Sequence, residues 1–190
     1  MNAGAFQIAG WITLFSAFFT IPFVIVAFAV AFWPDNRALE ALNRMLYVVN
    51  SALGIYILLT LRRLLHAYRF AAADLVISLQ ISGLVVMTLL EVGGELVAPR
   101  ELVDAMLLAF GIVLALLLTL LGYKLLPAVP LVQGPLATYA YLSMATGVCF
   151  ATLILIPIGL ITGIAESIYL AIVFFRNSET PAAASSVTSD

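Results

Sequence analysis

One apolar stretch near the C-terminus, from Leu136 to Phe175, constrains the fold more than any other feature. Glu166 is the only charged residue inside it. As a single helix the stretch would be about 60 Å long at 1.5 Å per residue, roughly twice the hydrocarbon core of a bilayer. It is too long for one membrane span, yet it holds no polar loop at which two spans could turn. Pro157 lies near its middle and is the expected place for a break.

The composition places the whole chain in a membrane. Of its 190 residues 64% are hydrophobic and only 9% are charged, and the mean hydropathy is +1.17. Soluble domains carry about a quarter charged residues, and apolar runs of about 20 residues are typical of transmembrane helices. We therefore expect an all-α, polytopic transmembrane bundle, in the plasma membrane of a prokaryote. Cys149 is the only cysteine, which excludes an intrachain disulfide and a multi-cysteine metal site.

The hydropathy pattern predicts five or six spans. Four cover about residues 5–33, 45–65, 71–90 and 101–126, and the terminal stretch supplies one or two more. Pro22 and Pro157 are expected to interrupt the first and last helices. Residues 1–176 are predicted to form a single transmembrane domain. Residues 177–190, rich in Ser, Thr and Ala, are predicted to form a disordered polar tail.

Small residues recur at every fourth position of the terminal stretch, except at Leu155, and predict a helix-packing face. Such residues let helix backbones approach closely inside a membrane. Because a strict four-residue period drifts around a 3.6-residue helix, two blocks separated at Pro157 fit better than one continuous contact. The face could pack inside the bundle, in a homo-oligomer or against partner subunits. The series is Ser143, Gly147, Ala151, Gly159, Gly163, Ser167 and Ala171.

Glu166 is the leading candidate for a functional side chain. If a sixth helix starts at Pro157, this carboxylate lies near the bilayer centre, where acidic residues usually face the bundle and often serve proton or ion movement. Burial there favours a protonated carboxyl bonded to a neighbouring hydroxyl. Thr13, Ser16 and Thr20 share one side of the first helix and could supply that hydroxyl. In the alternative, one span ends near Thr162 and Glu166 lies at the wet interface.

Charged clusters near the predicted span ends have simpler interpretations. Arg62, Arg63, His66 and Arg69 follow the second span, and arginines at a membrane edge commonly contact anionic lipid headgroups. We expect membrane lipids as their partners and no nucleic acid. Acidic residues around 91–104 could in principle hold Ca²⁺, but acids in a first helical turn are favoured by the helix dipole. A water-exposed helix end is the preferred interpretation, with no metal site.

Three functions remain open. Motifs of metalloproteases, serine hydrolases and nucleotide-binding loops are absent, so we expect no enzyme activity and no cofactor. The first hypothesis is a non-catalytic membrane protein that acts by packing against itself or partner subunits. The second is a small transporter or channel in which Glu166 couples to protons or cations. The third is a membrane enzyme with an unrecognised acidic site.

Overall fold

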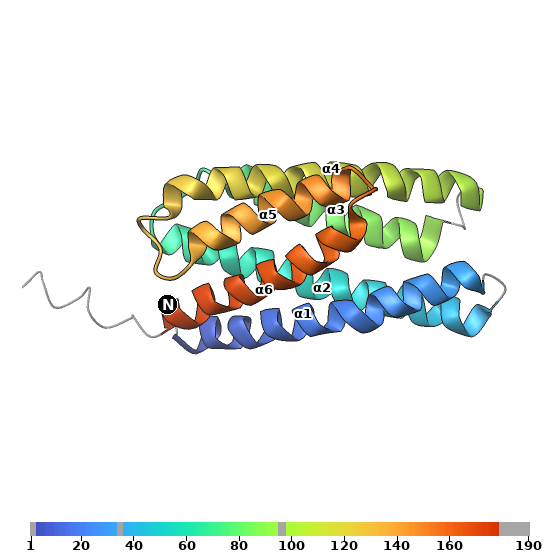
Figure 1. The fold of residues 1–190 in the computed structure, drawn as a ribbon, viewed down its shortest axis with the longest axis horizontal. Helices are drawn as coiled ribbons and strands as arrows, with labels where there is room; N and C mark the ends of the chain where they lie inside the picture. Colours follow the sequence, from blue (N-terminus) through green and yellow to red (C-terminus); the bar gives the residue numbers. More distant parts are fainter. Residues whose placement is uncertain (1–2, 34–35, 95–97, 179–190) are drawn as a thin grey trace, which may run out of the picture.

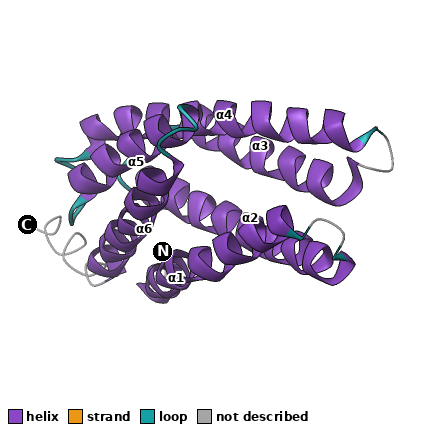
Figure 2. Cartoon of the chain, turned by 45° about the vertical axis from the view of Figure 1, so that its right-hand side comes forward, coloured by secondary structure: helices purple, strands orange, loops and turns teal. Residues whose placement is uncertain are grey.

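The computed structural model describes residues 3–33, 36–94 and 98–178, and over these residues it contains helices and turns but no strand (Figure 2). The predicted all-α membrane bundle is confirmed. Five helices of the described chain are long and apolar enough to cross a membrane, and a sixth, α5, is shorter. The helices are α1 (Ala3–Phe32), α2 (Arg37–Ala67), α3 (Asp74–Gly93), α4 (Arg100–Leu125), α5 (Leu136–Ala151) and α6 (Ile156–Ser178), with a 3-10 turn, η2 (Leu126–Ala128), after α4.

The second helix is longer than the predicted span. Asn36 caps it, because its side-chain oxygen accepts hydrogen bonds from the backbone N–H groups of Ala38 and Leu39 at 3.1 and 3.2 Å. The resulting 31-residue helix is about 46 Å long, which exceeds a hydrocarbon core of about 30 Å. The segment with Arg37 and Arg44, which precedes the predicted span, therefore belongs to the same continuous helix.

The six helices form a closed ring. Each helix from α1 to α6 packs against the next along the chain, and α6 packs back against α1. Aromatic contacts join the last pair: the Phe6 and Phe174 rings stack with centroids 6.4 Å apart, and Trp11 meets Phe175 edge to face at 5.4 Å. The start of α1 and the end of α6 consequently lie at one end of the bundle (Figure 1), which is called the terminal end below.

The long apolar stretch folds as the α5–α6 hairpin. Its connection at residues 152–155 lies well short of the end at which α1 joins α2 and α3 joins α4 (Figure 1). With 16 residues, α5 is about 24 Å long. Leu153 has a positive φ of 58° in the turn, and Ile154 is 87% exposed. The break therefore precedes Pro157, which is the second residue of α6. Proline is tolerated there because the N–H groups of the first helical turn have no carbonyl partner within the helix, so the N–H that proline lacks is not missed.

Pro22 behaves differently from Pro157. It lies inside α1, and the helix runs through it to Phe32 without ending. The described chain also continues as helix slightly past the predicted domain boundary, because Asn177 and Ser178 belong to α6. The remainder of the predicted tail, residues 179–190, lies outside the described residues.

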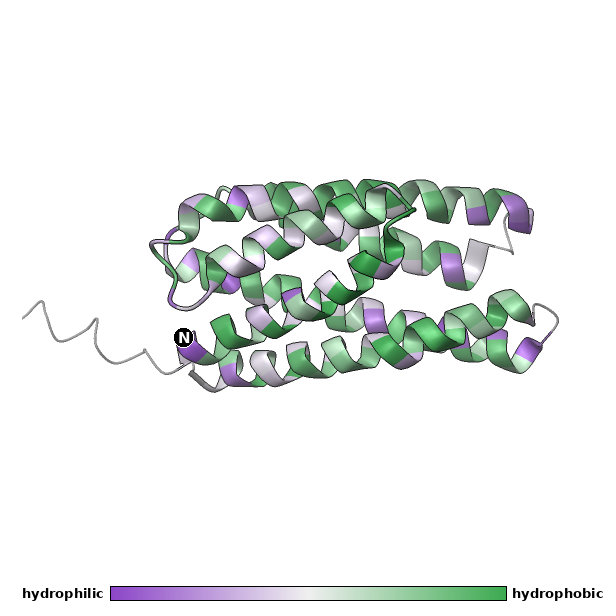
Figure 3. Ribbon diagram, in the orientation of Figure 1, coloured by the Kyte–Doolittle hydropathy of each residue, from purple (hydrophilic) through white to green (hydrophobic). Residues whose placement is uncertain are grey.

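Apolar packing is concentrated at the terminal end. Large apolar side chains elsewhere face outward, among them Phe18 at 63% and Ile161 at 70% exposed, as expected for a surface covered by lipid. Figure 3 shows hydrophobic residues along the lengths of the helices and hydrophilic residues mainly near their ends. The terminal-end core, a single cluster, is made of Phe6, Ala9, Leu61, Leu64, Leu65, Ala73, Val76, Ile77, Leu121, Leu125, Ala128, Val132, Leu136, Tyr139, Ala140, Leu170, Val173 and Phe174.

Candidate functional site

A partly open cavity of about 640 Å³ lies between the helices of the ring, and all six helices contribute to its lining, which includes the exposed Leu108 and Leu153. This volume falls in the range of about 300–1,000 Å³ that is typical of small-molecule sites. Tyr139 and Leu170 belong both to the lining and to the terminal-end core, so that core closes the cavity on one side. Most of the lining is apolar. Its polar side chains are Thr13, Ser16, Thr20, Asn50, Gln80, Tyr139, Glu166 and Ser167.

Glu166 lines this cavity from the middle of α6. Its side chain is buried, with the residue 8% exposed, and its Oε1 accepts a hydrogen bond of 2.7 Å from the Ser143 hydroxyl of α5. The chain turns between Ala151 and Ile156, so the alternative of a single span from Leu136 to about Thr162 does not agree with the structure. A buried carboxyl that has a neutral donor and lines a cavity can hold either a proton or a cation.

The predicted hydroxyl stripe of α1 lines the same cavity as Glu166. Two of its hydroxyls, however, donate within their own helix: Thr13 Oγ1 to the Ala9 carbonyl at 2.7 Å, and Thr20 Oγ1 to the Ser16 carbonyl at 3.0 Å. Hydroxyls in helices often bond the carbonyl four residues earlier in this way. The hydroxyl that meets the carboxyl comes from Ser143 instead, a residue that the spacing had placed only on the packing face.

The small-residue face contacts other helices of the same chain. A Cβ at Gly147 would meet the Ala115 carbonyl and Thr119 of α4, and a Cβ at Gly159 would lie 3.2 Å from Cys149 Cβ of α5. A Cβ at Gly163 would lie 3.5 Å from Thr146, which also belongs to α5. Ser143 and Ala171 are fully buried, Ser167 lines the cavity, and Ala151 is partly exposed. The three glycines of the series therefore lie at contacts between α4 and α5 or between α5 and α6.

Gln80 of α3 is the polar residue whose importance sequence reasoning missed. It is 5% exposed and lines the cavity, and its Oε1 has no hydrogen-bond partner among the described residues. An intramembrane Gln most often forms an interhelical hydrogen bond. That Gln80 Oε1 lacks a donor among the described residues becomes visible only in the structure, because it depends on which side chains surround Gln80.

The predicted headgroup cluster lies at the α2–α3 turn of the terminal end. Arg63, His66 and Arg69 are exposed, but His66 Nε2 lies 2.6 Å from Asp74 Oδ2, and Arg62 Nε lies 3.4 Å from Asp74 Oδ1. Asp74 thus partly neutralises this cluster. Contact with lipid headgroups stays a prediction.

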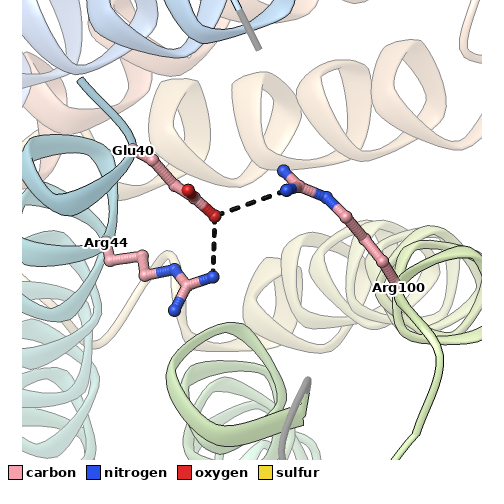
Figure 4. A network of polar contacts seen from close by, with 3 residues as sticks. All are labelled: Glu40, Arg44 and Arg100. Carbon is pink, nitrogen blue, oxygen red and sulfur yellow. Dashed lines mark hydrogen bonds and ion pairs between the residues drawn. The ribbon is translucent and has the colours of Figure 1, made fainter. Parts of the chain in front are cut away.

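A second charged network lies at the opposite end of the bundle. Glu40 of α2 pairs with Arg44 of the same helix at 2.8 Å and with Arg100 of α4 at 3.4 Å, both through Oε1 (Figure 4). The Glu40–Arg100 pair links two helices that are not neighbours in the ring, at the end that the α5–α6 hairpin does not reach.

The described residues were compared with the arrangements that bind metal ions. Within the described residues, no group of three or more His, Cys, Asp or Glu side chains is placed to hold a metal ion. Glu95, one member of the predicted acidic group, lies outside those residues.

Comparisons with protein-family models, with curated proteins and with solved structures each find no match to this chain.

Proposed function

We propose that this multi-pass membrane protein is a small transporter in which Glu166 binds a proton and a monovalent cation in turn. One observation carries the proposal: among the described residues, the only charged side chain of the cavity lining is a buried carboxyl in the middle of a membrane helix. Intramembrane acidic groups that face a cavity are typical of proton and cation pathways.

The exchange needs no group beyond those of the cavity. In the resting state the Glu166 carboxyl is protonated and accepts a hydrogen bond from the Ser143 hydroxyl. A cation that enters the cavity displaces the proton, which leaves to water, and the carboxylate then pairs with the cation. Release of the cation on the other side allows a proton to return. Each cycle therefore moves one proton in the direction opposite to one cation.

The two ends of the ring supply candidate barriers for alternating access. At the terminal end the Asn177 side chain accepts a hydrogen bond from the Tyr68 hydroxyl at 2.6 Å and donates to the Gln133 carbonyl at 2.7 Å. This joins α6 to the α2–α3 turn and to the loop before α5. At the other end the polar link is the Glu40–Arg100 pair. Transport through the cavity would require these links to open alternately.

The competing hypotheses have less support. The packing hypothesis relied on the small-residue series, and members of that series are occupied by contacts within the chain. For the enzyme hypothesis, the lining formed by the described residues contains no His, Cys or Lys that could activate a nucleophile, and no second carboxylate.

The test is a flux measurement in proteoliposomes. Ethidium, a permanently charged and fluorescent cation, is loaded inside and a pH gradient is imposed, with sodium and potassium ions tested in parallel. We expect proton-driven flux of at least one of these cations in the wild type and its loss in Glu166→Gln. The matched control is Glu101→Gln, which makes the same change at an exposed position outside the cavity. Wild-type flux no greater than in empty liposomes, or full flux in Glu166→Gln, would overturn the proposal.

A further inference from the structure

The charges that line the cavity favour a ligand whose polar group, called the head below, is cationic. Over the described residues, Glu166 is the single charged group of the lining, and Tyr139 is the one other titratable side chain. The remaining polar lining groups of this part of the chain are hydroxyls and amides, with no Arg, Lys or His. A cationic head would gain an ion pair here, whereas an anionic head would meet a like charge in a poorly solvated site.

Gln80 adds a second, independent requirement. Its Oε1 is a buried acceptor without a partner among the described residues, and the residue lines the cavity. Buried acceptors in native proteins are nearly always paired, so an unpaired one next to a cavity points to a donor supplied by a ligand. A head with N–H groups has donors for the carboxylate of Glu166 and for Oε1 of Gln80, which line the same cavity, whereas a fully alkylated ammonium or a bare metal ion supplies no N–H.

The apolar walls of the cavity favour a ligand whose remaining part, called the body below, is also apolar. Apart from Glu166, Gln80 and a few hydroxyls, the walls are mainly aliphatic side chains of α4 and α6, including Leu107, Ile112 and Leu160. Such walls favour an apolar body over a hydrated inorganic ion, because apolar surface leaves water when it is covered. The volume of about 640 Å³ accommodates a molecule of drug-like size.

We infer that the cavity binds amphipathic amines, with the protonated amino group donating to Glu166 and Gln80 and the apolar body against the α4 and α6 walls. This inference rests on the proposed function, since it names the cation that Glu166 exchanges for a proton. On binding, the carboxyl O–H bond breaks, the proton leaves to water, and the ammonium ion pairs with the carboxylate.

The test is a binding measurement that needs no transport. The purified full chain in phosphatidylcholine nanodiscs is titrated calorimetrically with diphenylpropylamine and three probes that share its body: the trimethylammonium analogue, diphenylpropanol and diphenylpropanoic acid. We expect the amine to bind at least tenfold more tightly than the alcohol, the trimethylammonium analogue to fall between them, and the acid not to bind. Equal affinity for amine and alcohol, or tighter binding of the acid, would overturn the inference.

Two variants separate the contributions of the head. Glu166→Gln should reduce amine affinity to that of the alcohol, and Glu101→Gln should leave it unchanged. Gln80→Met, which keeps the side-chain volume, should reduce the preference for the amine over its trimethylammonium analogue, because only the N–H bonds to Glu166 remain, while both probes still bind more tightly than the alcohol. A preference unchanged in Gln80→Met would overturn the role of that residue. Melting temperatures of the variants check that they fold.

Two further arms identify the source of the amine and separate this inference from transport. Added phosphatidylethanolamine should compete with diphenylpropylamine only if the natural ligand is a lipid headgroup, and lack of competition assigns a free amine. Glu166-dependent binding without any flux in liposomes would overturn transport and support the binding site. Proton-coupled flux of ethidium together with no discrimination among the four probes would overturn the amine site and leave transport standing.

Discussion

The Ser143 hydroxyl donates a hydrogen bond of 2.7 Å to Glu166 Oε1 across the α5–α6 hairpin, and both residues are buried. This contact fixes the position of the carboxyl that we propose as the transport site. It also joins the two halves of a sequence stretch that contains no other charge.

Loss of this donor is expected to weaken the fold modestly and to disturb the site. Ser143→Ala leaves a buried acceptor without its partner, at a cost of about 1–3 kcal/mol. We expect a lower melting temperature in detergent and an altered rate of cation exchange. Ser178→Ala is the matched control, because the Ser178 hydroxyl lies outside the cavity lining and donates at 2.6 Å to the Phe175 carbonyl of its own helix. Equal behaviour of the two variants would contradict a special role for Ser143.

Gly147 is expected to tolerate no side chain. A Cβ there would collide with the Ala115 carbonyl and with backbone and side-chain atoms of Thr119, and helix backbone cannot move aside easily. Gly147→Ala should destabilise the protein by about 1–3 kcal/mol, as overpacking does elsewhere. Gly111 of α4 has nothing within 4 Å of an added Cβ, so Gly111→Ala should instead stabilise by about 0.5–1 kcal/mol. Unfolding titrations of both variants would show whether the signs differ.

The class of fold was predictable because apolar length and lack of charge leave a chain few alternatives to crossing a membrane. A break in the terminal stretch was predictable because the stretch is about twice as long as one membrane span, and Pro157 marked its approximate place. Proline alone would not have located it, because α1 continues as helix through Pro22. The small-residue series stays a prediction as a whole, although an added Cβ at Gly147 or Gly159 would approach a neighbouring helix closely. Each of these features is local, so it can be read from residues that are neighbours in the chain.

The partners of individual side chains were not predictable, because helical spacing defines a face but not what the face meets. The α1 stripe and Glu166 do line one cavity, yet the hydroxyl on the carboxyl belongs to Ser143 of α5. The free acceptor of Gln80 depends on the ring closing around it. Asn177 was assigned to a polar tail, because nothing in its local sequence shows that Tyr68 and Gln133 approach it.

The turn of the α5–α6 hairpin is expected to lie in lipid rather than in water. Its exposed residues are mainly apolar, and backbone groups bond within the turn, with Leu153 N–H donating to Phe150 O at 3.2 Å and Gly159 N–H to Leu155 O at 2.8 Å. Because unsatisfied backbone polar groups are costly in hydrocarbon, these internal bonds are what would permit the turn to lie in lipid, and we expect it near the edge of the apolar layer rather than at its centre.

A spin label reports this depth directly. In a Cys149→Ala background, a label at Ile154→Cys should be relaxed by oxygen, which concentrates in lipid, and not by a water-soluble nickel complex. A label at Gln133→Cys, exposed in the loop before α5, should show the reverse. A nickel-accessible label at position 154 would mean that the hairpin crosses to the water on the far side.

Asn177 is expected to hold the terminal end closed. Besides its bonds to Tyr68 and Gln133, its side-chain amide donates to the Val173 carbonyl at 2.8 Å. Asn177→Leu removes all three bonds and should cost about 1–3 kcal/mol. It should also speed hydrogen exchange in residues 129–135 and at the end of α6. Ser178→Ala, which removes only a local bond to the Phe175 carbonyl, should leave both measurements near wild type.

The Glu40–Arg100 pair is expected to control access more than stability. Arg100 is 53% exposed on its side chain and the separation is 3.4 Å, so the pair should contribute only about 0.2–1 kcal/mol. It nevertheless joins α2 to α4 where the hairpin is absent. Arg100→Gln should therefore leave the melting temperature nearly unchanged while cation exchange becomes faster. The distribution of distances between spin labels on the first turns of α2 and α4 should also broaden.

Reversal of the same pair tests whether its charges act through each other. Glu40→Arg combined with Arg100→Glu keeps the two opposite charges but places a second guanidinium one helical turn from Arg44. Like charges four residues apart on a helix repel, so the reversed pair should restore the link between α2 and α4 only in part. An unchanged distance distribution in Arg100→Gln would show that the pair does not restrain this end.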